Sequence, residues 1–71
     1  SPKNAPVKPT KPADFFAIGL QRQSKGDLRG AIAAYSQAIK LNPKYGAAYN
    51  SRGLAKFDSG DKQGAIADYN Q

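Results

Sequence analysis

Apolar residues recur every three or four positions after residue 12, which is the spacing of amphipathic helices. A first stripe contains Phe15 and Ile18. A second stripe follows Gly26 and Asp27 and contains Leu28, Ala31, Ile32, Tyr35, Ala38 and Ile39. The pattern predicts an all-α chain with helices at about residues 14–25, 28–41, 46–59 and 62–71.

Short connections predict how these helices are joined. Gly26 can adopt a positive φ at the end of a helix, and Asp27 can cap the free amides of the next one. The turn between the first two helices is short, so they should pack antiparallel. Pro43 disfavours helical geometry in the residue before it and should end the second helix.

The sequence repeats itself at a spacing of 34 residues. Gly26-Asp27 recurs as Gly60-Asp61, residues 30–33 recur as 64–67, and Gly19 and Tyr35 recur as Gly53 and Tyr69. A fixed period of this length is typical of stacked helical repeats. Glycine within a helix costs about 1 kcal/mol relative to alanine, so the recurring glycines indicate a close approach of helices. The tyrosine of each repeat should fill the space that they leave.

These positions resemble the tetratricopeptide repeat, a pattern of large, glycine, small, aromatic, small and proline residues over 34 positions. The first repeat, residues 13–45, matches at Phe15, Gly19, Ala31, Tyr35, Ala38 and Pro43. The second, residues 46–71, matches at Tyr49, Gly53, Ala65 and Tyr69 and is truncated. About one and three-quarter repeats are present. Arg22 and Lys56 depart from the pattern, which usually has an aromatic residue there.

The resemblance implies a superhelix of antiparallel helix pairs whose first helices line a concave groove for partner proteins or peptides. The corresponding apolar positions are Phe16, Leu20, Leu54 and Phe57, and Asn50 can hydrogen-bond an extended backbone. The predicted function is a non-catalytic scaffold that binds an apolar segment of a protein or peptide. The alternative, that these side chains pack against neighbouring helices or the tail, stays open. Acidic chaperone tails are disfavoured, because Phe16, Leu20 and Ser51 occupy the places of the lysine and asparagines that clamp the tail carboxylate.

The truncated repeat leads to a second hypothesis for function. The second copy reaches Gln71 without counterparts of Ala38, Ile39 and Leu41. Helices in such arrays bury their apolar faces against the next repeat. We therefore expect Ala65, Ile66 and Tyr69 to form an uncovered face, at a cost of about 1.5 to 3 kcal/mol for each large side chain. Either the chain belongs to a longer array, or copies form a homo-oligomer by stacking or exchanging helices through this face.

Composition narrows the chemistry. The 71 residues contain no cysteine, no histidine and no glutamate, and the five acids are all aspartates. Disulfides, metal centres and acid–base or serine-nucleophile catalysis are therefore not expected, and neither is a cofactor. The net charge of +6 raises nucleic-acid binding as a further alternative. However, Lys3, Lys8 and Lys11 supply three of the eleven cations and the other eight are scattered, so weak non-specific binding is the less favoured prediction.

The first twelve residues have the composition of a basic, proline-rich linker, with prolines at positions 2, 6, 9 and 12. Pro6 and Pro9 have the PxxP spacing, so a ligand for an aromatic-lined groove is the alternative to a spacer. The first residue is serine, which indicates a processed or excised piece of a longer protein. No apolar run has the length of a membrane span or a secretion signal, so we expect a soluble protein, with the cytoplasm favoured.

Overall fold

The computed structural model describes residues 8–71, so most of the predicted linker, residues 1–7, lies outside the described residues. The described residues form four helices and no strand. In chain order these are α1 (Pro12–Ser24), α2 (Leu28–Leu41), α3 (Gly46–Asp58) and α4 (Lys62–Tyr69). The all-α fold class predicted from the sequence is confirmed.

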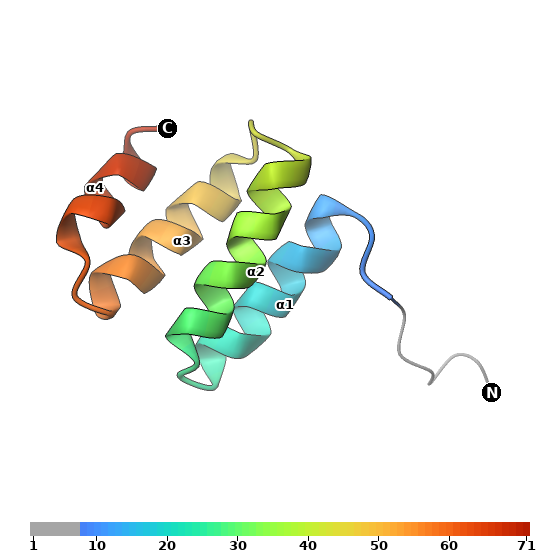
Figure 1. The fold of residues 1–71 in the computed structure, drawn as a ribbon, viewed down its shortest axis with the longest axis horizontal. Helices are drawn as coiled ribbons and strands as arrows, with labels where there is room; N and C mark the ends of the chain where they lie inside the picture. Colours follow the sequence, from blue (N-terminus) through green and yellow to red (C-terminus); the bar gives the residue numbers. More distant parts are fainter. Residues whose placement is uncertain (1–7) are drawn as a thin grey trace.

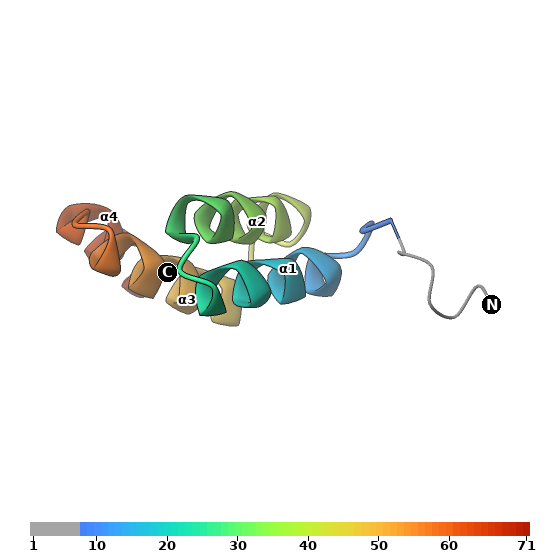
Figure 2. The ribbon, with the colours of Figure 1, turned by 90° about the horizontal axis from the view of Figure 1, so that it is seen from below.

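The helices form two antiparallel hairpins in two layers. α1 pairs with α2 and α3 pairs with α4, while α3 also packs along α2 (Figure 1). Figure 2 shows α1 and α3 side by side in one layer, with α2 and α4 on the other side of them. The Cα positions extend over 45 × 25 × 13 Å, so the molecule is long and thin. Most residues therefore lie close to a surface.

α1 begins two residues earlier than the sequence pattern indicated. Pro12 occupies its first turn, where a missing backbone N–H costs nothing and the fixed φ favours the helix. The Asp14 carboxylate accepts hydrogen bonds from the backbone N–H groups of Thr10 and Lys11, at 3.1 and 3.0 Å. These bonds lower the pKa of Asp14. The other bounds differ by at most two residues from expectation, with α4 ending at Tyr69.

The turns within the two hairpins have the same construction. Gly26 and Gly60 have φ values of 81° and 98°, a conformation that glycine adopts without steric cost. Asp27 and Asp61 follow them and accept a hydrogen bond from the N–H of Gly30 and of Gly64, both at 2.9 Å. Each aspartate thus satisfies one of the free amides at the start of α2 or α4.

The core consists mainly of alanines and one tyrosine. Tyr35 is the largest fully buried side chain of the described residues, and its ring lies against Gly19, where any Cβ would overlap it. The second repeat has the same arrangement, since a Cβ on Gly53 would lie 2.8 Å from Cε1 of Tyr69. The expected close approach of the helices is therefore present in both hairpins.

Ala65 corrects one expectation. We expected it to be part of an uncovered face, but it is only 1% exposed. Its carbonyl oxygen lies at the crossing of α3 and α4, 3.3 Å from the position of a Cβ on Gly53. The hairpin itself covers Ala65 because Gly53 lets α4 approach closely. The exposed apolar side chains of α4 are therefore Ile66 and Tyr69.

Candidate functional site

The layer of α1 and α3 presents a row of exposed apolar side chains, which we call the α1/α3 face. Leu20 on α1 and Leu54 and Phe57 on α3 are each 46 to 48% exposed. Asn50 is also exposed and lies one turn before Leu54 on the same side of α3. Small exposed residues complete the set of positions predicted to line this face, namely Ala13, Ala17 and Ala47.

Phe16, which the sequence also assigned to this face, is half-buried. Its ring centroid lies 5.7 Å from that of Tyr35 and 5.3 Å from that of Tyr45, which precedes α3. Gln23, a further predicted lining position, accepts a hydrogen bond from the Tyr35 hydroxyl. Both residues of α1 therefore support Tyr35, and Leu20 is the large apolar side chain that α1 leaves exposed on this face.

The chemistry of the α1/α3 face is apolar with one hydrogen-bonding amide. Leu20, Leu54 and Phe57 can bury apolar side chains of a ligand, and exposed apolar side chains grouped in this way mark interaction surfaces. The Asn50 amide can both donate to and accept from a peptide backbone. None of these four side chains carries a charge, so the face favours a neutral segment.

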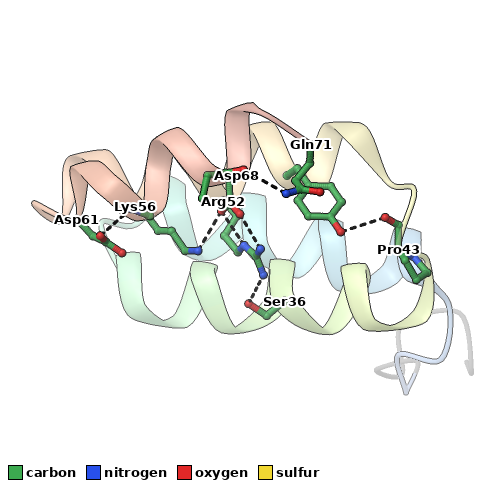
Figure 3. Close-up of polar contacts among 10 residues, drawn as sticks. Ser36, Pro43, Arg52, Lys56, Asp61, Asp68 and Gln71 are labelled. Carbon is green, nitrogen blue, oxygen red and sulfur yellow. Dashed lines mark hydrogen bonds and ion pairs between the residues drawn. The ribbon is translucent and has the colours of Figure 1, made fainter.

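A buried ion cluster lies on the other side of α3, between α2 and α4. Asp68 on α4 is 4% exposed, and Arg52 on α3 donates to both of its oxygens, from Nε at 2.8 Å and from Nη2 at 2.7 Å. Lys56 places Nζ 3.1 Å from Asp68 Oδ2. Arg52 Nη1 also donates to Ser36 Oγ on α2, at 3.1 Å (Figure 3). Arg52 therefore joins α2, α3 and α4.

The charges of this cluster stabilise one another. Burial raises the pKa of Asp68, but the hydrogen bonds from Arg52 and Lys56 outweigh it and bring the pKa below its ordinary value. The hydrogen bond with Asp68 in turn raises the pKa of Arg52. The guanidinium also lies 5.5 Å from the ring centroid of Tyr49. The cluster satisfies its own charges and is best explained as a structural element.

Reasoning from the sequence missed this cluster, although the repeat contains a signal for it. A shift of 34 residues places Arg52 on Ile18 and Asp68 on Ala34. The first repeat thus has an apolar pair where the second has a cation and an anion. The joint replacement of facing residues by opposite charges indicates an ion pair.

A pocket lies at the opposite end of the molecule from α4, on the side of the α1–α2 hairpin that α3 does not cover. Its volume is ≈ 200 Å³. It is lined by Pro9, Phe15, Ile18, Arg22, Ala33, Ala34 and Gln37. None of these residues belongs to the α1/α3 face, so the pocket is separate from the predicted binding surface.

The described residues contain no group of three potential metal ligands among histidine, cysteine, aspartate and glutamate. Within residues 8–71, none of the helices has the length and apolar character that crossing a membrane requires.

Comparison with known proteins gave one match. The family model described as "TPR repeat" matches residues 19–60, which is more than half of the chain. The matched segment runs from Gly19 in α1 to Gly60 after α3, and so contains Leu20, Asn50, Leu54 and Phe57. No curated protein and no solved structure matched the chain.

Proposed function

Because the chain belongs to the tetratricopeptide repeat family, we propose that it is a scaffold that binds an apolar segment of a partner protein on its α1/α3 face. Repeats of this family generally mediate protein–protein interaction, and the fold is typically non-catalytic. What the proposal adds is the surface and the character of the ligand.

One observation carries this proposal: Leu20, Leu54 and Phe57 leave close to half of their surface exposed on two helices that lie side by side. Burying one such side chain contributes on the order of 1.5 to 3 kcal/mol when it is fully covered. These side chains are already partly covered, so each contributes about half of that amount. Asn50, adjacent on α3, supplies the polar contact that fixes a backbone in place.

The test is a selection of binding peptides from a random library, followed by measurement of their affinities for variants. Selected peptides should be rich in apolar residues, and Leu54→Gln and Phe57→Gln should each weaken their binding by about tenfold, or 1.4 kcal/mol. Leu41→Gln is the matched control, because Leu41 is 50% exposed but lies at the end of α2. Peptides that bind the Leu54 and Phe57 variants as well as the original chain would count against this surface.

Self-association is the alternative, as the sequence indicated. The exposure of Ile66 and Tyr69 supports an interface at the α4 end, whereas the buried Ala65 offers no surface to a partner. Light scattering over a range of concentrations tests this alternative. A mass that rises with concentration, and that Ile66→Gln returns to the monomer value, would favour it over the scaffold function.

A further inference from the structure

The internal repeat allows the uncovered end of the molecule to be compared with a covered copy of itself. Tyr35 and Tyr69 occupy equivalent positions, and each ring lies against the glycine of its own hairpin. Tyr35 is 0% exposed, whereas Tyr69 is 48% exposed. Similarly, Ile32 is half-buried, whereas its counterpart Ile66 is 59% exposed. We call Ile66 and Tyr69 the α4 end face.

Two neighbours account for the better cover of Tyr35. One is Phe16 from its own hairpin, which the second repeat replaces with Asn50. The other is Ala55 of α3, which packs with Ala31 and Tyr35 in one buried cluster. Ala55 belongs to the helix that follows the hairpin in the array. The α4 end face has no equivalent of that helix within the described residues.

The contacting side of α3 shows what kind of helix fits such a face. Ala55 and Ala48 lie two turns apart on one side of α3, and both are 0% exposed. A methyl group at these places allows the helices to approach closely, and a larger side chain would need space that a packed interface does not offer. We propose that the α4 end face binds a helix with small residues at two positions seven apart, as α3 presents them to α2.

The first repeat of a second copy does not meet this requirement. A shift of 34 residues places Asp14 of α1 on Ala48 and Gln21 on Ala55. The Asp14 carboxylate is held by two backbone N–H groups and its pKa is lowered, so it is charged at neutral pH. Burying a charge without a charged partner is costly, and the longer Gln21 would face Tyr69 where Ala55 faces Tyr35. The occupant is therefore a helix of a different sequence, and head-to-tail stacking of copies is disfavoured.

A tethered helix provides the test, because attachment removes most of the entropic cost of association. Gln71 is followed by a second copy of residues 38–59, which continues the repeat in register and adds a copy of α3. The matched control has the same length but carries Ala48→Asp and Ala55→Gln within the appended copy. Both proteins extend α4 equally, so their difference reports on the contacting side of the added helix. The measurements are urea unfolding and the hydrogen-exchange protection of α4.

We expect the alanine version to have an unfolding equilibrium constant at least about tenfold smaller than the control, a difference of 1.4 kcal/mol. Ile66→Gln should reduce that difference if the helix lies on the α4 end face. Equal stability of the two extended proteins would overturn the proposal, and so would a difference that Ile66→Gln leaves unchanged. In the chain without extension, a dimer in light scattering that Ile66→Gln disrupts would also overturn it, because the occupant would then be a second copy. None of these readouts depends on the α1/α3 face.

Discussion

Asp68→Ala tests the role of the ion cluster between α2 and α4. The change leaves the Arg52 and Lys56 side chains, 17% and 21% exposed, without the carboxylate that both contact. Removing one partner of a buried ion pair typically costs about 3 to 5 kcal/mol. Solvent reaches both cations here, so we expect a loss of about 3 kcal/mol. That is a large share of the roughly 4 to 10 kcal/mol total stability of a chain of this size.

The first repeat supplies the compensating change. Ile18 and Ala34 stand where Arg52 and Asp68 stand in the second repeat, so Arg52→Ile combined with Asp68→Ala restores an apolar pair. Replacing both partners of a buried pair is often neutral, and the double variant should lie within about 1 kcal/mol of the original chain.

Urea unfolding followed by circular dichroism measures these free energies. Asp58→Ala is the control, since Asp58 is an exposed aspartate at the end of α3. The reasoning fails if Asp68→Ala costs less than about 1 kcal/mol, or if the double variant is no more stable than the single one.

Three further predictions concern pH, the glycines and a helix cap. The pKa of Asp68 is lowered by folding, so its contribution is complete above the unfolded pKa of about 3.9 and is lost at lower pH. The difference in unfolding free energy between the original chain and Asp68→Asn should therefore be constant down to about pH 5 and shrink below about pH 4. Gly19→Ala should destabilise the chain by about 2 kcal/mol in urea because its methyl group overlaps Tyr35, whereas Gly46→Ala, which meets open space, should change stability by less than about 1 kcal/mol. Asp61→Ala should lower the thermal midpoint, with a loss of about 1 kcal/mol, because it removes the cap of α4; an unchanged midpoint would contradict that role.

The features that the sequence predicted well are local or repeated. The helices follow from the spacing of apolar residues, and the turns follow from Gly26-Asp27 and Gly60-Asp61. The fit of Tyr35 against Gly19 was also predictable, because both residues recur at the same spacing and a mid-helix glycine needs a reason.

The features that the sequence did not reveal depend on contacts between distant residues. Phe16 is half-buried because Tyr45, from the connection before α3, packs on the side of its ring away from Tyr35. The Asp68 cluster needs side chains from three helices, and no single helix indicates that its charges meet. Ala65 is buried because the α3–α4 hairpin closes fully without a following helix.

The burial of Tyr35 also sets an order of local opening along the chain. The α1–α2 hairpin holds the largest fully buried side chain of the described residues, and α3 covers it. α4, the shortest helix, rests on α3 alone and has its tyrosine half exposed. Backbone amides of α4 should therefore exchange with solvent through small fluctuations, while those of α2 exchange only when most of the structure opens. The helix that presents the α4 end face is then the one whose folding a bound partner would complete.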